Sequence, residues 1–188
     1  MNKIILASNS PRRKELLQKA GIEFIIDASS IEERMDETLP LEKKLQQLAI
    51  DKATPIHKKY PNDIVIGADT IVYFQNQIIG KAKDEKEARK ILNALSNHRH
   101  CVYTSVAIYF QDELITFIDQ TDVYFKDITD MIDKYIASKE WIGKAGAYGI
   151  QGSADCFVDH VDGDIDNVIG LPLYKVISLF KEKGILHQ

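Results

Sequence analysis

The stretch IVIGADTIV occupies residues 64–72 and places one carboxylate, Asp69, inside a run of apolar, mostly β-branched residues. Runs of this composition are typical of buried strands, so we expect strands over 64–67 and 71–74. A buried carboxylate without a partner is strongly unfavourable. The pattern therefore favours a functional Asp69 that faces a cleft as a general base or metal ligand. The alternative is a turn aspartate between two strands.

Strand-like and helix-like segments alternate on both sides of this stretch. We expect further strands at 4–7, 23–26, 78–79, 101–110, 113–125 and 156–161, and helices at 11–20, 41–60, 85–95, 129–137 and 171–183. Pro55 is expected to kink or split the second helix. This order predicts an α/β fold, with a mixed central sheet flanked by helices. We expect one domain over residues 1–188, shaped as two lobes with a cleft.

Charge and cysteine usage narrow the class of protein. The chain has 188 residues, with 24 Lys and Arg against 28 Asp and Glu, and a net charge of −4. This balance argues against a duplex-DNA-binding surface, so a polyanion would need locally concentrated positive charge. The two cysteines form no CxxC pair, and no apolar run approaches the roughly 20 residues of a membrane span. We therefore expect a soluble, cytoplasmic protein with no nucleic-acid and no membrane partner.

A second informative segment, residues 7–17, reads ASNSPRRKELL. Ser10 suits the N-cap of a helix, and the proline after it suits the first helical position. The helix dipole favours negative charge in this first turn, yet positions 12–14 are all basic. The choice makes sense if an anion binds at the start of the helix. The alternative is a basic turn exposed to solvent.

A glycine-rich segment, residues 144–152, reads KAGAYGIQG. Glycine lets a backbone approach a ligand, and the Gln151 amide could read a nucleobase edge. On spacing alone, however, a flexible surface loop is the favoured interpretation. Lys52 and Lys81 could each neutralise a phosphate, although most lysines are simply solvated.

Metal-ligand patterns are weaker. Glu32 and Glu33 could supply a second carboxylate to a hard cation. Residues 162–166 imitate the start of a calcium-binding loop, but the required glycine and closing glutamate are missing. His98 and His100 have no third ligand nearby in the sequence, so zinc binding is not expected.

Taken together, these motifs resemble those of the Maf nucleotide pyrophosphatases. The matching segments are collinear and span nearly the whole chain: 8–13 with 16–17, 48–53, 67–70, 80–81, 100–102, 144–152 and 167–172. The resemblance implies a fold similar to that of inosine triphosphate pyrophosphatases, with an active cleft between two lobes. It also implies hydrolysis of a nucleoside triphosphate to the monophosphate and pyrophosphate, with a divalent cation, Mg²⁺ first and Mn²⁺ as the alternative.

The resemblance also assigns roles to residues. Asp69 matches the family's proposed general base, and Glu33 and Asp69 are the expected metal ligands. The polar residues expected around the triphosphate and metal are Ser8, Arg13, Glu33, Lys52 and Lys81.

Three positions distinguish branches of the family. Here they carry Arg12, Thr70 and Gln151, which resemble the branch that prefers dTTP and UTP. The branch acting on 7-methyl-GTP has Trp, Gln and Glu instead. Two alternatives stay open: a purine-directed or 7-methyl-GTP-directed pyrophosphatase, and a non-enzymatic nucleotide-binding regulator of septum formation. The oligomeric state is also open, with a homodimer as one candidate.

Overall fold

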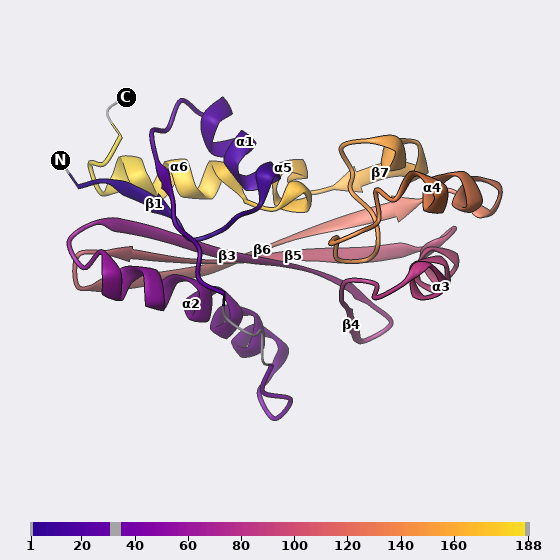
Figure 1. Ribbon diagram of the computed structural model, residues 1–188, viewed down its shortest axis with the longest axis horizontal. Coiled ribbons are helices and arrows are strands. Elements are labelled where there is room, and N and C mark those ends of the chain that lie inside the picture. Colours follow the sequence, from indigo (N-terminus) through magenta and orange to yellow (C-terminus); the bar gives the residue numbers. More distant parts are fainter. Residues whose placement is uncertain (1, 31–34, 187–188) are drawn as a thin grey trace. The chain divides into compact units, whose positions relative to one another are not determined.

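The computed structural model describes residues 2–30 and 35–186, and Figure 1 shows its elements. They follow one another as β1 (Ile4–Leu6), α1 (Pro11–Lys19), β2 (Ile25–Ile26), α2 (Leu41–Lys59), β3 (Ile64–Phe74), β4 (Gln77–Ile79), α3 (Glu85–Leu95), β5 (Arg99–Phe110), β6 (Glu113–Phe125), η1 (Thr129–Met131), α4 (Ile132–Ser138), η2 (Ser153–Phe157), β7 (Val158–Asp162), α5 (Ile165–Ile169) and α6 (Leu173–Glu182). Within the described ranges, no helix combines the length and the apolar character needed to cross a membrane.

The strands form one mixed sheet in the order β2-β1-β3-β5-β6-β7, and β4 pairs with β3. β1 lies parallel to β2 and β3, whereas the β3–β4 and β6–β7 pairs are antiparallel. The tight β3–β4 turn is made by Gln75 and Asn76, both with positive φ, as such hairpins require. The predicted α/β class, a mixed sheet flanked by helices, is confirmed.

The chain divides into two compact units, each assembled from separated segments. The first contains the described residues of Met1–Asp69, Thr104–Asp119 and Gly170–Gln188, and the second those of Thr70–Tyr103 and Gln120–Ile169. The strands β3, β5 and β6 each contribute residues to both units. Two compact units agree with the expected two lobes, and the cleft between them stays a prediction.

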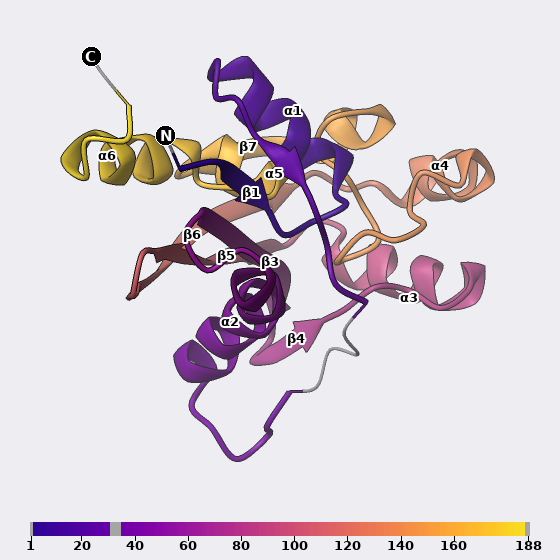
Figure 2. The same ribbon diagram turned by 60° about the vertical axis from the view of Figure 1, so that its left-hand side comes forward.

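In the first unit, α1 and α6 cover one face of the sheet and α2 covers the other (Figures 1 and 2). Small residues allow α2 to approach β3 closely. A Cβ atom on Gly67 would lie 2.7 Å from the Ala49 carbonyl oxygen and 2.7 Å from the Ala53 Cβ. No side chain fits in that space, which explains the glycine in the middle of a buried strand.

The helix α2 runs unbroken through Pro55, so the predicted split does not occur. Proline cannot donate an N–H to the carbonyl one turn earlier. Buried neighbours on either side, Ala53 and Ile56, belong to the same core cluster and hold the helix against the sheet. Tertiary packing here outweighs the local preference.

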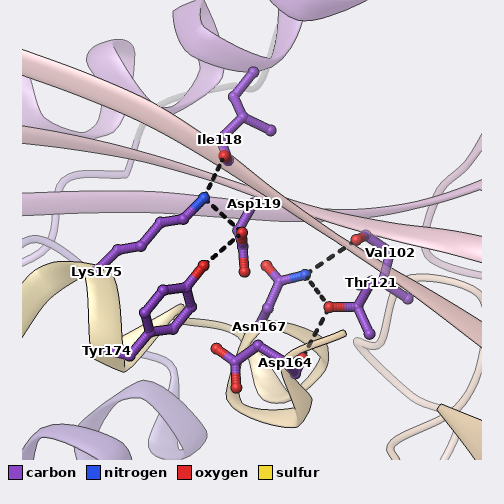
Figure 3. Close-up of polar contacts among 8 residues, drawn as sticks. All are labelled: Val102, Ile118, Asp119, Thr121, Asp164, Asn167, Tyr174 and Lys175. Atoms are coloured by element: carbon purple, nitrogen blue, oxygen red, sulfur yellow. Dashed lines mark hydrogen bonds and ion pairs between the residues drawn. The ribbon is translucent and has the colours of Figure 1, made fainter. Parts of the chain in front are cut away.

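In the second unit, a fully buried amide ties α5 to the sheet (Figure 3). Asn167 Nδ2 donates to the Val102 carbonyl at 3.1 Å and to Thr121 Oγ1 at 2.9 Å, and Thr121 Oγ1 donates to the Asp164 carbonyl at 2.8 Å. These bonds fix α5 against β5 and β6 from within the core.

Candidate active site

The carboxylate of Asp69 lies in the middle of the continuous strand β3 and is 8% exposed. Lys52 Nζ donates to Asp69 Oδ1 and forms an ion pair with it. The pairing follows from the close approach of α2 at Gly67, since Lys52 directly precedes Ala53, one of the two contact residues. The missing side chain at Gly67 thus lets the lysine reach the strand.

This geometry excludes the turn alternative for Asp69, because β3 does not break there. It also supplies the cation that burial of a carboxylate requires. Asp69 is therefore a buried carboxylate with a cationic partner, and its assignment as general base stays a prediction.

The segment before α1 forms a hydrogen-bonded loop around Arg13. Ser10 caps the helix, its Oγ accepting from the Arg13 N–H at 3.4 Å. Ser8 Oγ accepts from the Ser10 N–H at 3.2 Å and from Arg13 Nη1 at 3.1 Å. Arg13 Nε donates to the Gly170 carbonyl at 2.7 Å, and the residue is only 8% exposed. The solvated-turn alternative is therefore wrong for Arg13, and Arg12 is half-buried.

Ser8 and Asp69 lie just beyond a paired point on two adjacent parallel strands. Leu6 pairs with Ile66, and the Ala7 N–H donates to the Ile66 carbonyl at 2.8 Å. Ser8 and Asp69 follow these residues in the carboxyl-terminal direction. Ligands of α/β proteins commonly bind beyond the carboxyl ends of parallel strands. The register therefore places both residues at the edge where a ligand is expected.

In the second unit, the glycine-rich segment packs against β3 and the segment that carries Lys81. Lys81 and Ala145 form an antiparallel bridge, and the Gly146 N–H donates to the Gly80 carbonyl at 3.1 Å. Gly146 has φ +67°, and a Cβ there would lie 2.7 Å from Val72 Cγ2. Residues 146–150 are buried, so the interpretation as a flexible surface loop is wrong.

Thr70 lies two residues before Val72 and shares its face of β3, the face that contacts the glycine-rich segment. Gln151 follows the buried part of that segment and is exposed. The second unit therefore contains the predicted residues Thr70, Lys81 and Gln151, while the first contains Ser8, Arg12, Arg13, Lys52 and Asp69.

A buried hydrogen bond ties the glycine-rich segment to β5. His100 Nε2 and the Tyr148 hydroxyl are 2.7 Å apart, and the two rings make an edge contact. Burial lowers the pKa of His100 to about 4 and raises the pKa of Tyr148, so both are neutral at pH 7.

Lys81 also lines a groove of about 850 Å³ in the second unit, together with Lys83, Lys86 and Lys90. Asp84 and Glu87 line the same groove, so its charged side chains comprise four lysines and two carboxylates. Glu33, the second predicted metal ligand, lies outside the described residues. Within residues 2–30 and 35–186, no three His, Cys, Asp or Glu side chains gather as a metal site.

Two contributors to this arrangement were missed from the sequence: the Gly170 carbonyl, which accepts from Arg13, and the His100–Tyr148 pair. Gly170 has φ +141°, a conformation that favours glycine, so the glycine ahead of the last helix was an available signal. No sequence spacing indicates that its carbonyl meets a residue 157 positions earlier.

Comparison of the sequence with known proteins identifies the class to which this protein belongs, the Maf family. The family model described as Maf-like protein matches residues 3–183, and the chain belongs to this family. A relative from Bacillus cereus (strain AH820), named dTTP/UTP pyrophosphatase, is 45% identical over 186 residues, covering 98% of this chain and 97% of the relative. A relative of the same name from Bacillus anthracis is 44% identical with the same coverage.

Comparison with solved structures gives partial matches to more distant proteins. A HAM1 protein from Coxiella burnetii has a TM-score of 0.44 and 18% identity, covering 66% of this chain and 73% of its own. The Ham1 protein of Staphylococcus aureus has a TM-score of 0.43 and 19% identity, with coverages of 67% and 73%. The family assignment rests on the sequence relatives.

Proposed function

We propose that this protein is a nucleoside triphosphate pyrophosphatase that hydrolyses dTTP and UTP to the monophosphate and pyrophosphate. The observation that carries the proposal is the buried Asp69–Lys52 pair, found in a chain 45% identical over 186 residues to proteins named dTTP/UTP pyrophosphatase. The pair supplies a carboxylate and an ammonium just beyond the parallel pairing of β1 with β3, where a ligand is expected.

The cations of the site suit a triphosphate. A protein of net charge −4 needs localised positive charge to bind a strongly anionic substrate. Arg12 and Arg13 lie in the first turn of α1, where the helix dipole also favours an anion. Lys52 and Lys81 add point charges that can follow a phosphate during the reaction.

Asp69 is the residue that we assign to activation of water. Its carboxylate would orient a water molecule and accept one proton from it as the oxygen attacks the α-phosphorus. The new bond joins that oxygen to the α-phosphorus, and the bond from the α-phosphorus to the bridging oxygen breaks. Pyrophosphate leaves with the bridging oxygen, while nearby cations stabilise its growing charge.

A divalent cation fits the donor set. Mg²⁺ binds through one or two carboxylates together with substrate phosphates and water, and the carboxylate of Asp69 is held at the proposed site. Asp69 and Glu33 are the residues that would hold Mg²⁺, with Mn²⁺ as the alternative. When bound, the cation would neutralise negative charge on the phosphate oxygens.

Thr70 and Gln151 are the residues that we assign to base recognition, with Arg12 as the third position characteristic of the pyrimidine branch. The Gln151 amide offers both a donor and an acceptor, which suits the edge of uracil or thymine. Gln151 is exposed and directly follows the buried residues 146–150, which leaves its amide accessible to a ligand.

The test is release of pyrophosphate from a panel of triphosphates, with and without Mg²⁺, for wild type and Asp69→Asn. Mg²⁺-dependent release from dTTP and UTP that is lost in the variant is the expected result. Release from purine or 7-methylated substrates instead would overturn the pyrimidine assignment. Absence of release from every substrate would overturn the enzymatic assignment and favour a nucleotide-binding regulator.

A further inference from the structure

An ion pair between a buried carboxylate and a partly exposed lysine lies in the first unit, outside the residues assigned to the reaction. Asp119 on β6 is 8% exposed. Lys175 Nζ lies 2.6 Å from Asp119 Oδ1, and the Tyr174 hydroxyl donates to the same oxygen at 3.2 Å (Figure 3). Lys175 Nζ also donates to the Ile118 carbonyl at 3.1 Å. Both donors come from the first turn of α6.

This pair is poorly explained by stability alone. The buried Asp119 carboxylate loses hydration that the attraction of Lys175 must offset, so the net gain in stability from such a pair is small. An ion pair of this kind instead favours one position of the helix on the strand, because each charge is stable only close to its partner. The start of α6 lacks another such contact at its N-cap, because Pro172 makes no side-chain capping bond. Lys175 and Tyr174 therefore fix the position of the first turn of α6 on β6.

The first turn of α6 is directly connected to the acceptor of Arg13. Gly170, whose carbonyl accepts from Arg13 Nε at 2.7 Å, lies three residues before Leu173, the first residue of α6. Three residues span at most about 11 Å, and the proline among them has a fixed φ. Residues 170–173 are all buried. A shift at the start of α6 is therefore passed on to the Gly170 carbonyl.

We infer that Asp119 and Lys175 are positioning residues for Arg13. By holding the start of α6, they hold the Gly170 carbonyl against Nε, while Ser8 Oγ accepts from Nη1. Two hydrogen bonds on different nitrogens fix the plane of the guanidinium, and a planar guanidinium recognises phosphate only in a defined orientation. This role rests on the proposed function, in which Arg13 binds the substrate phosphates.

The fold offers a matched control at the other end of the same helix. Lys183, the C-cap residue directly after α6, forms a second ion pair with β6, with its Nζ 2.5 Å from Glu113 Oε2. Lys183 is ten residues beyond Leu173, so this pair is far along the chain from Gly170. The experiment compares the double variant Asp119→Leu/Lys175→Met with Glu113→Leu/Lys183→Met. Each removes both charges of one pair and leaves no buried charge unpaired.

Two readouts are taken on each protein. The first is solvent exchange of the Arg13 Nε proton by NMR, with the signal assigned by its loss in Arg13→Lys. The second is kcat and KM for dTTP, alongside the Tm. We expect Arg13 Nε exchange to become about tenfold faster and KM to rise about fivefold in the first variant only. The effect on KM should vanish in an Arg13→Lys background, because the two changes act through one contact.

Equal Arg13 Nε exchange in both double variants would overturn the positioning role. Faster exchange without a change in KM would overturn its connection with substrate. Wild-type protein that releases no pyrophosphate would refute the proposed function, whereas the NMR comparison would still decide whether the pair positions Arg13. If Asp119→Leu/Lys175→Met fails to fold, Tyr174→Phe, at an exposed residue, gives the same comparison with a smaller expected change.

Discussion

Lys52 and Asp69 form an ion pair between α2 and β3, beside the point where Gly67 lets helix and strand approach most closely. Neither residue would meet the other if a side chain separated the two elements. The pair is therefore a consequence of packing as much as of charge, and each contribution can be tested separately.

Asp69→Asn is expected to reduce turnover by about 10²–10⁴-fold, the usual contribution of a general base. The amide has nearly the same shape, so the fold should persist. Pyrophosphate release and circular dichroism check the two expectations. Asp27→Asn is the matched control, because Asp27 pairs with Lys59 on the same helix and has no assigned role. Unchanged turnover in Asp69→Asn would contradict the base assignment.

Gly67→Ala is expected to push α2 away from β3, because the new Cβ would lie 2.7 Å from backbone and side-chain atoms of α2. We expect a loss of about 1–3 kcal/mol in the free energy of unfolding. Activity at permissive temperature should also fall, since Lys52 moves with the helix. Gly80→Ala is the control, as a Cβ there meets no atom within 4 Å. Urea unfolding and kcat measure both effects, and equal behaviour of the two variants would argue against the close-approach explanation.

His100 is expected to make the protein less stable as the pH falls from 6.5 towards 4. Burial lowers the pKa of His100 from 6.5 to about 4 in the folded state, so only the unfolded chain takes up a proton in this window. The gap corresponds to at most roughly 3 kcal/mol of unfolding free energy. Stability should be fully present above pH 6.5 and decline below it, with the nearby Asp122 charge partly opposing the loss.

Urea unfolding of wild type and His100→Phe between pH 7 and pH 4 measures this effect. The variant loses the hydrogen bond to Tyr148 at every pH, but its stability should depend less on pH in this window. Carboxylates titrate in both proteins and cancel in the comparison. Parallel pH profiles for the two proteins would show that His100 does not titrate as its burial indicates.

Gln151→Glu is expected to weaken the preference for dTTP over dGTP more than it weakens binding of the triphosphate. A carboxylate keeps the size of the amide but loses its donor, and with it one hydrogen bond to a pyrimidine edge. The ratio of kcat/KM values for the two substrates is the measurement. Gln111→Glu, at an exposed turn, controls for the added charge. Unaltered selectivity would mean that Gln151 does not read the base.

Local chemistry made part of this structure predictable. Ser10 and Pro11 have strong positional preferences at helix starts, and α1 begins as they indicate. The carboxylate of Asp69 conflicts with its apolar surroundings, and that conflict indicated that the carboxylate has a partner, which in the structure is Lys52. Both inferences need only neighbouring residues.

Features that depend on packing between distant residues could not be predicted from the sequence. Pro55 lies inside a continuous helix because buried neighbours hold that helix to the sheet. The glycine-rich segment is buried because Gly146 fits against Val72 and the segment bridges to Lys81, contacts that spacing cannot reveal. The Arg13–Gly170 bond joins residues 157 positions apart. Each of these outcomes depends on a partner that is distant in sequence.

The segmented make-up of the first unit has a consequence for synthesis on the ribosome. Residues 1–69 emerge early and carry Ser8, Arg13, Lys52 and Asp69, yet the same unit includes Thr104–Asp119 and the chain from Gly170 onward. A nascent chain therefore has Ser8 as one acceptor for the Arg13 guanidinium but lacks the Gly170 carbonyl, the acceptor for Nε, until residue 170 has been translated. Folding during synthesis cannot complete the first unit from residues 1–69 alone, because the buried Arg13 gains its acceptor for Nε only when the segment from Gly170 has emerged.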